Sequence, residues 1–141
     1  AARAAGDPDA PALEQRLKSS EFKAALALVQ NGQRALVRQD WNAAIDAYSR
    51  MLASGPDADV LQRLAFACSK AGRHDEAIAH ADAARALAPQ NPDAVHMAGL
   101  ARLNAGRDLG QAIALLRAAA GANPGNETYK ADLERAEAAA S

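Results

Sequence analysis

Features that would indicate a catalytic, nucleic-acid-binding or membrane-spanning protein are scarce in this 141-residue sequence. It contains one cysteine, Cys68, which excludes an intrachain disulfide. Its 16 basic residues nearly balance 17 acidic ones, and a net charge of −1 gives no field that would attract nucleic acid or anionic lipid. No apolar run approaches the roughly 20 residues that span a bilayer, and no signal peptide is visible. We therefore expect neither a nucleic-acid partner nor a membrane span.

The composition also argues against a β architecture. Only 4% of the residues are aromatic, although 50% are hydrophobic, and runs of valine, isoleucine and threonine with period-two alternation are missing. Much of the apolar content is alanine, which is the best helix former. The length allows one ordinary domain with a sizeable core. We therefore expect a single all-α domain.

One short pattern occurs three times along the chain. An alanine followed by isoleucine begins at Ala44, Ala77 and Ala112, at intervals of 33 and 35 residues, and a proline follows each alanine twelve residues later. A period of this size is typical of stacked helical hairpins, in which neighbouring repeats bury each other's apolar faces. It indicates a binding scaffold rather than a catalytic pocket.

Apolar spacing together with glycine, proline and asparagine signals predicts the helix boundaries. Ser19 and Ser20 are expected to interrupt the N-terminal helical region, and Asn91 and Asn126 are expected to cap the helices that follow them. Residues 1–9 are expected to be disordered. The predicted helices cover residues 11–18, 21–38, 41–53, 58–71, 74–87, 92–105, 110–120 and 127–139.

The repeats also place residues of matching size at matching sites. In each repeat the first helix carries a large apolar residue and, four residues later, a small one; the second helix carries an alanine, with further apolar residues four and seven positions later. These sites are occupied in turn by Leu28, Leu61 and Val95; by Gly32, Ala65 and Gly99; by Ala44, Ala77 and Ala112; by Tyr48, Ala81 and Leu116; and by Met51, Ala84 and Ala119. Small facing side chains let two antiparallel helices approach closely. The pattern resembles the tetratricopeptide repeat family.

The resemblance implies a right-handed superhelix of antiparallel helical hairpins, an α-solenoid. In the last helix, Glu134 and Glu137 take the places of packing residues, so we expect the array to end there. Two polar residues at normally apolar sites, Asn31 and Arg102, are expected to reach solvent, or, for Asn31, to pack against the N-terminal helix. The expected segments are an N-terminal helical region at 10–24, repeats at 25–57, 58–91 and 92–125, and a capping helix at 126–139.

The sequence offers little for catalysis or for a cofactor. Cys68, His74 and His80 have a spacing that matches no zinc-binding pattern. Cys68 also falls at a buried site, where a small core hydrophobe fits better than a nucleophile. No phosphate-binding glycine loop, serine-nucleophile elbow or His-Glu-x-x-His motif occurs. We therefore expect no enzyme activity, no catalytic residue, no cofactor and no metal.

The resemblance further implies that the first helices of the hairpins line an inner groove. The residues that would face it form an apolar strip edged by polar side chains, and exposed strips of this kind usually mark a binding site. An open alternative is that the N-terminal helix folds over part of the strip. The expected ligand-contacting residues are Val29, Gln33, Leu36, Gln62, Phe66, Ser69, His96, Leu100 and Leu103.

Chaperone-binding members of this family hold the C-terminal carboxylates of a peptide with lysine, arginine and asparagine on the same face. The equivalent sites here are Val29, Gln33, Arg63 and Met97, only one of which is basic. We therefore do not expect an acidic C-terminal tail to bind in that manner.

The sequence thus predicts a non-catalytic protein–protein interaction scaffold that captures an extended or helical apolar segment in its groove. The alanine- and arginine-rich composition suggests a bacterial protein. The resemblance to bacterial members of the family implies an assembly factor, in the cytoplasm or the periplasm. Two other functions stay open: a chaperone that keeps a secreted or translocator protein soluble, and the recognition domain of a larger enzyme. Self-association through exposed helix faces also stays open.

Overall fold

The computed structural model describes residues 9–141, which form seven α-helices and one short 3₁₀-helix. No strand occurs in this range, and none of its helices combines the length and the hydrophobicity that crossing a bilayer requires. Residues 1–8 of the expected disordered lead lie outside the described residues. The elements are α1 (Ala10–Val37), α2 (Trp41–Met51), η1 (Leu52–Ser54), α3 (Ala58–Lys70), α4 (His74–Leu87), α5 (Pro92–Ala105), α6 (Leu109–Ala122) and α7 (Glu127–Ala140).

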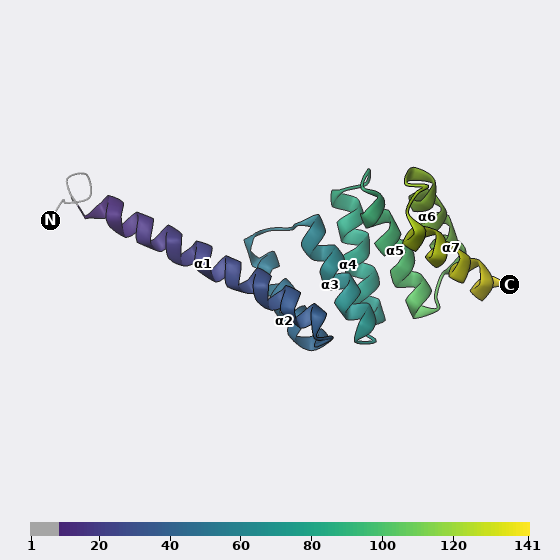
Figure 1. The fold of residues 1–141 in the computed structure, drawn as a ribbon, viewed down its shortest axis with the longest axis horizontal. Coiled ribbons are helices and arrows are strands. Elements are labelled where there is room, and N and C mark those ends of the chain that lie inside the picture. Colours follow the sequence, from purple (N-terminus) through teal and green to yellow (C-terminus); the bar gives the residue numbers. More distant parts are fainter. Residues whose placement is uncertain (1–8) are drawn as a thin grey trace.

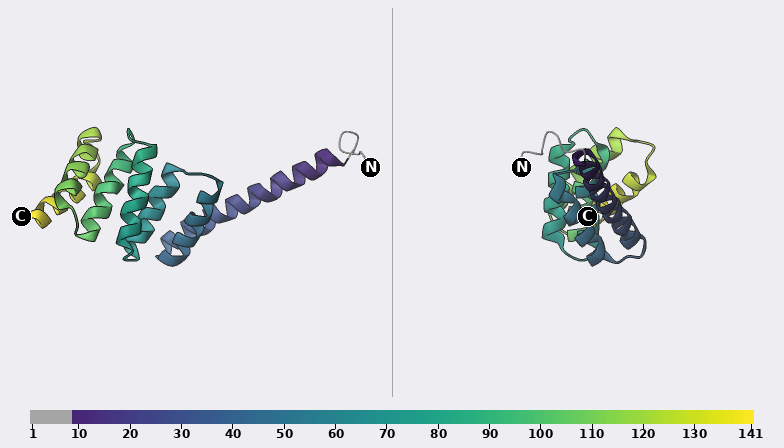
Figure 2. Two further views of the ribbon diagram at one scale, coloured as in Figure 1. Left: turned by 180° about the vertical axis from the view of Figure 1, so that it is seen from behind. Right: turned by 90° about the vertical axis from the view of Figure 1, so that its left-hand side faces the viewer.

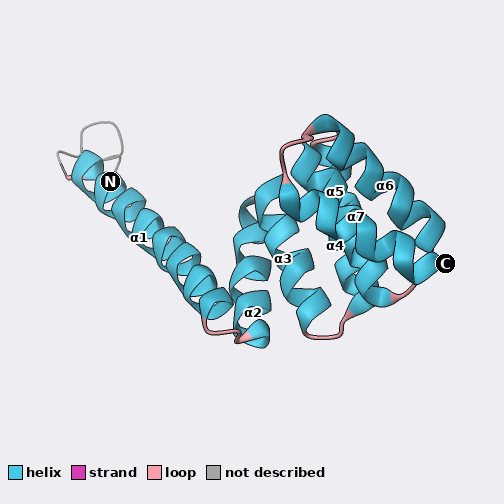
Figure 3. Cartoon of the chain, turned by 45° about the vertical axis from the view of Figure 1, so that its right-hand side comes forward, coloured by secondary structure: helices cyan, strands magenta, loops and turns pink. Residues whose placement is uncertain are grey.

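The helices stack side by side as a row of antiparallel hairpins (Figure 1). Each α-helix packs against the next along the chain, and α5 also contacts α3 and α7. Short loops join the helices of the stack (Figure 3). The predicted all-α superhelix of antiparallel hairpins is confirmed, and helices α2 to α7 begin and end within about two residues of their predicted limits.

Side-chain caps fix the starts of four helices. The predicted caps are confirmed: the Asn91 side chain accepts a hydrogen bond from the backbone N–H of Asp93 at 2.9 Å, and Asn126 accepts one from Tyr129 at 3.0 Å. Asp40 and Asp57 act in the same way at the starts of α2 and α3. Such caps satisfy backbone donors that have no partner within the helix.

The predicted interruption at Ser19 and Ser20 is wrong, because α1 is one continuous helix. Serine costs only a few tenths of a kcal/mol relative to alanine inside a helix, and no glycine or proline stands between Pro11 and Gly32. The N-terminal helical region and the first helix of repeat 1 are therefore one element. Its N-terminal half projects away from the stack in Figure 1 and in the left-hand view of Figure 2, and it does not fold over the inner face.

Small residues hold the helices of a hairpin close together, as the sequence predicts. A Cβ atom added at Gly99 would lie 2.8 Å from Cγ of Leu116 and 3.1 Å from the carbonyl oxygen of Ala112. At Gly32 the added atom would lie 2.9 Å from Cζ of the buried Tyr48 ring. These distances leave no room for a side chain at either glycine.

We expect Gly99→Ala to lower the free energy of unfolding by about 1–2 kcal/mol, because overpacking outweighs the gain of about 1 kcal/mol in helix propensity. The matched control is Gly121→Ala in α6, where an added Cβ meets nothing within 4 Å. That variant should leave stability unchanged or raise it by up to about 1 kcal/mol. Urea unfolding followed by circular dichroism measures both, and an unchanged or more stable Gly99→Ala would contradict the close contact.

Asn31 and Arg102, the two polar residues at normally apolar sites of the repeats, lie in different environments. Asn31 is exposed, as expected. The expectation that Arg102 reaches solvent is wrong, because its side chain is 7% exposed and two of its nitrogens each donate to a carboxylate oxygen of Asp82 at 2.8 Å. Asp82 lies on α4, so this ion pair joins the second and third hairpins. In α7, Glu134 and Glu137 are both exposed, in agreement with a solvated last helix.

Candidate ligand-binding face

The predicted site residues lie on three helices that belong to successive hairpins. Two of them do not have the predicted character. Ser69 is buried, at 7% exposure, and offers little surface to a ligand. His96 is engaged by α7. Gln33 is exposed, and the others are half-buried: Val29, Leu36, Gln62, Phe66, Leu100 and Leu103.

Phe66 is the largest side chain among the predicted contacts, and three other features surround it. Its ring meets the ring of Trp41 edge-on, with centroids 5.9 Å apart and an interplanar angle of 77°. The Lys70 ammonium lies 5.5 Å from the Phe66 ring centroid, within the range of a cation–π contact. Phe66 also packs against the buried core and stays partly exposed. It therefore combines a rigid position with an apolar surface open to a partner.

A hollow opens where α1 leaves the stack. Its volume is about 330 Å³, and it lies between α1, η1 and the start of α3. One predicted contact residue, Val29, lines it, and the other side chains are mostly apolar. The lining residues are Ala25, Leu28, Val29, Met51, Ser54, Gly55, Pro56, Asp57 and Val60. Ala25, Leu28 and Val29 of α1 form one side of this hollow.

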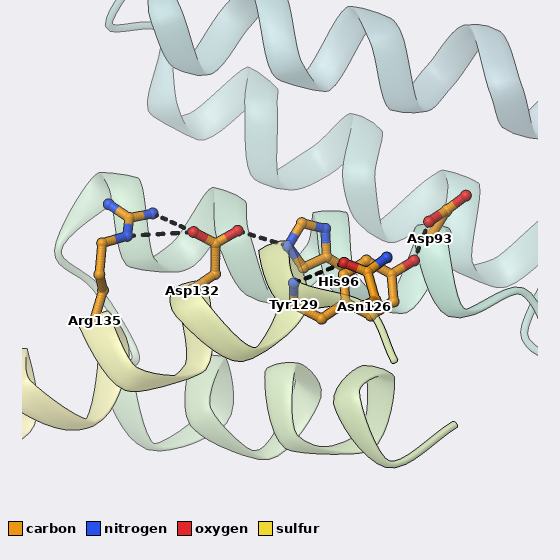
Figure 4. A network of polar contacts seen from close by, with 6 residues as sticks. All are labelled: Asp93, His96, Asn126, Tyr129, Asp132 and Arg135. Atoms are coloured by element: carbon orange, nitrogen blue, oxygen red, sulfur yellow. Dashed lines mark hydrogen bonds and ion pairs between the residues drawn. The ribbon is translucent and has the colours of Figure 1, made fainter. Parts of the chain in front are cut away.

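His96 belongs to a polar network between α5 and α7 (Figure 4). Its Nε2 atom lies 2.8 Å from Oδ2 of Asp132, and Arg135 donates to Oδ1 of the same carboxylate. The Tyr129 ring stacks on the His96 imidazole, with centroids 4.5 Å apart. The His96 side chain is only 12% exposed. Contacts with α7 therefore occupy Nε2 and one face of the His96 ring, and leave little of this side chain to a ligand.

Tyr129 also connects α7 to the start of α5. Its hydroxyl donates a hydrogen bond to the Asp93 carboxylate (Figure 4). Burial, and then the hydrogen bond and charge of Asp93, raise the pKa of Tyr129 well above its usual range, so the hydroxyl keeps its proton. No local sequence signal predicts this network, because His96 and Asp132 are separated by 36 residues.

The most exposed large apolar side chains lie mainly on α1 rather than on the predicted strip. Phe22 is 68% exposed and Leu17 is 64% exposed, and Leu13 and Leu26 are also open. The helical spacing of Phe22 and Leu26 correctly predicted a helix. It did not reveal that no other described helix covers this part of α1 (Figure 2).

One group of potential metal ligands lies away from the inner face, between α3 and α4. The sulfur of Cys68, a carboxylate oxygen of Glu76 and an imidazole nitrogen of His80 all lie within 4.8 Å of one another. The spacing of Cys68, His74 and His80 did not predict this group, because its third member is Glu76. The missed signal is the spacing of Glu76 and His80, which places them one turn apart on the same helix face.

Comparisons with known proteins agree with this architecture. Residues 58–103 match the tetratricopeptide repeat family model. A curated relative is the small glutamine-rich tetratricopeptide repeat-containing protein 2 of Mycosarcoma maydis, which is 30% identical over 124 residues. That match covers 87% of this chain and 33% of the relative, so the chain spans about a third of the relative's length.

Solved structures show the same fold. The tetratricopeptide repeat domain of Sgt2 from Aspergillus fumigatus is 28% identical with a TM-score of 0.74, over 82% of this chain and 78% of that one. The TPR2B domain of yeast Sti1, solved in a complex with pHsp70, is 26% identical with a TM-score of 0.71, over 81% of this chain and 96% of that one.

Proposed function

Because the chain belongs to the tetratricopeptide repeat family and is a protein-interaction scaffold, we propose that it binds an apolar segment of a partner protein on its inner face. The segment would lie across α3 and α5 and reach the hollow beside α1. The bacterial origin suggested by the composition stays a prediction.

The observation that carries this proposal is the partly exposed Phe66 ring, held in place by Trp41 and the core. A ring fixed before binding loses little conformational freedom when a ligand covers it. Leu100 on α5 also packs against the core and stays partly exposed. Val60, six residues before Phe66, lines the hollow, which places the two features about 9 Å apart along α3.

The charges near this face favour an apolar ligand over an acidic tail. Of the sites that hold carboxylates in chaperone-binding relatives, Val29 is apolar, Gln33 is uncharged and Met97 is buried at 6% exposure. Arg63 alone supplies a positive charge there, and Lys70 lies over the Phe66 ring. The Sti1 domain in complex with pHsp70 supports a chaperone tail as the competing ligand, so the experiment includes one.

The test compares two glutamate substitutions of apolar residues. Phe66→Glu should weaken binding of an apolar peptide at least about tenfold, since a buried charge costs more than the 1.4 kcal/mol that a tenfold change represents. Leu87→Glu is the matched control, because Leu87 lies at the end of α4 and is already 49% exposed. It should change the dissociation constant less than about twofold, within the usual effect of a surface substitution.

The probes are fluorescein-labelled 15-residue peptides selected on an array of apolar, acidic and scrambled sequences. A peptide ending in Glu-Glu-Val-Asp with a free carboxylate tests the competing ligand. Fluorescence anisotropy gives the affinities, and thermal melting, in which Phe66→Glu should stay within a few degrees of the unaltered chain, checks the fold. Val29→Gln provides a second test on α1 if Phe66→Glu is unstable. Tighter binding of the acidic peptide, or equal binding by both glutamate variants, would contradict the proposal.

A further inference from the structure

Three side chains that ligate metals meet between α3 and α4. Cys68 lies in the last turns of α3, and Glu76 and His80 lie one turn apart on α4. Their ligand atoms are within 4.8 Å of one another. Because α3 and α4 pack as a hairpin, two rigid helices place the three groups, and no loop conformation is needed to bring them together.

We propose that Cys68, Glu76 and His80 form a binding site for one Zn²⁺ ion, with a fourth position open to water. Thiolate sulfur, imidazole nitrogen and carboxylate oxygen are the usual ligands of zinc, and sites with three protein ligands keep one position for water. Bond lengths of 2.0–2.3 Å place the ligand atoms of a tetrahedral site about 3.5 Å apart. Side-chain rotations that move the ligand atoms by about 1 Å would bring them from within 4.8 Å to this spacing.

The donor set selects the class of metal. A mixed sulfur, nitrogen and oxygen site suits Zn²⁺ and related transition metals better than Mg²⁺ or Ca²⁺, which prefer oxygen alone. The three residues also form a gradient of exposure. Cys68 is fully buried, His80 is half-buried, and the Glu76 side chain is 48% exposed. An ion would enter past Glu76 and reach the sulfur last.

His80 has no other polar role among the described residues. Cys68 serves as a small core hydrophobe and Glu76 pairs with Arg73, but the His80 ring makes no hydrogen bond with the rest of residues 9–141. On binding, Zn²⁺ would replace the thiol proton of Cys68, which passes to solvent.

Arg73 is the competing cation at this site. It donates to the two carboxylate oxygens of Glu76 at 3.0 and 2.7 Å. Each carboxylate oxygen has a second lone pair, so Glu76 can bind a metal while keeping part of this contact. The positive charge of Arg73 nevertheless opposes a second cation nearby. Removing Arg73 should therefore strengthen metal binding.

The experiment titrates Co²⁺ and then Zn²⁺ into the chain under reducing conditions. We expect one equivalent of Co²⁺ to produce the visible bands of a four-coordinate ion and a near-ultraviolet thiolate-to-cobalt charge-transfer band, and Zn²⁺ to remove both. Zn²⁺ should also raise the melting temperature, because only the folded chain holds the three ligands together and so binds the ion more tightly than the unfolded chain. Absence of the charge-transfer band would overturn the proposal.

Variants separate this site from adventitious binding. His80→Ala should weaken Zn²⁺ at least tenfold, Cys68→Ser should abolish the charge-transfer band, and Arg73→Ala should tighten Zn²⁺ severalfold. His74→Ala is the matched control, because His74 starts α4 but lies outside the ligand group. Glu76→Gln, at an exposed position, gives a second test if Cys68→Ser does not fold. Equal effects of His80→Ala and His74→Ala, or an unchanged affinity in Glu76→Gln, would overturn the proposal.

Discussion

Replacing Tyr129 with alanine should release α7 from the stack while the preceding hairpins stay folded. The Tyr129 side chain is 3% exposed, its ring stacks on His96, and its hydroxyl donates to Asp93. Truncation of a buried aromatic residue costs about 3–5 kcal/mol. In a repeat array each unit contacts only its neighbours, so this loss falls on the terminal helix. A free helix of 14 residues is marginal in water.

Hydrogen exchange followed by mass spectrometry measures the effect directly. The backbone amides of α7 should exchange about 100-fold faster or more in Tyr129→Ala, as a loss of about 3 kcal/mol requires, and those of α3 should keep their protection. Tyr129→Phe is the matched control. It keeps the ring over His96 and removes one hydrogen bond, at a cost of about 1 kcal/mol, because Asp93 is exposed and water can solvate it. Cooperative loss of protection along the whole chain would contradict a separately attached α7.

The hairpin helices could be predicted because their signals are local. Asn91 caps α5 and Asn126 caps α7 through neighbouring backbone groups, and Gly106 ends α5 with a φ of 68° that favours glycine. The extent of α1 could not be predicted in the same way. Two serines weaken a helix only slightly, so whether they end it depends on packing beyond the sequence window.

The candidate site was predicted less well because exposure depends on distant residues. The helix position of Phe66 was correctly identified as partly open, but Lys70 and Trp41 around it were missed. His96 occupies an equivalent inner position and is covered by Tyr129 and Asp132 of α7. The residues near His96 in the sequence do not predict these contacts with α7. The position of a residue in a repeat therefore predicts which face of the stack its side chain points to. Whether the side chain is exposed there depends on the neighbouring repeat.

The second large effect on stability is expected at Asp82, whose carboxylate pairs with the buried Arg102. Its guanidinium donates to two oxygens of Asp82 and to the carbonyl oxygen of Ala98. The hydrogen bonds from Arg102 to Asp82 raise the pKa of Arg102. Asp82→Ala leaves that charge buried without its partner, and we expect a loss of about 3 kcal/mol in the free energy of unfolding.

Replacing the other partner, Arg102, should lower the free energy of unfolding much less. Arg102→Met keeps a long side chain against the core and leaves Asp82, whose side chain is 38% exposed and can be hydrated. We expect a loss of about 1 kcal/mol or less for Arg102→Met. The double variant Asp82→Ala/Arg102→Met removes both charges and should be about 2 kcal/mol more stable than Asp82→Ala alone. Urea unfolding followed by circular dichroism completes this double-mutant cycle.

An exposed ion pair supplies the control for the cycle. Asp46 and Arg50 lie one turn apart on α2, with Nε of Arg50 3.2 Å from Oδ2 of Asp46. Both side chains are more than 60% exposed. Asp46→Ala should cost at most about 0.5 kcal/mol, since surface pairs contribute little. The large effect at Asp82 comes from the unpaired buried guanidinium rather than from the loss of a favourable pair. If the double variant were no more stable than Asp82→Ala, Arg102 would not be the source of the loss, and the buried ion pair would not explain how α4 and α5 are held together.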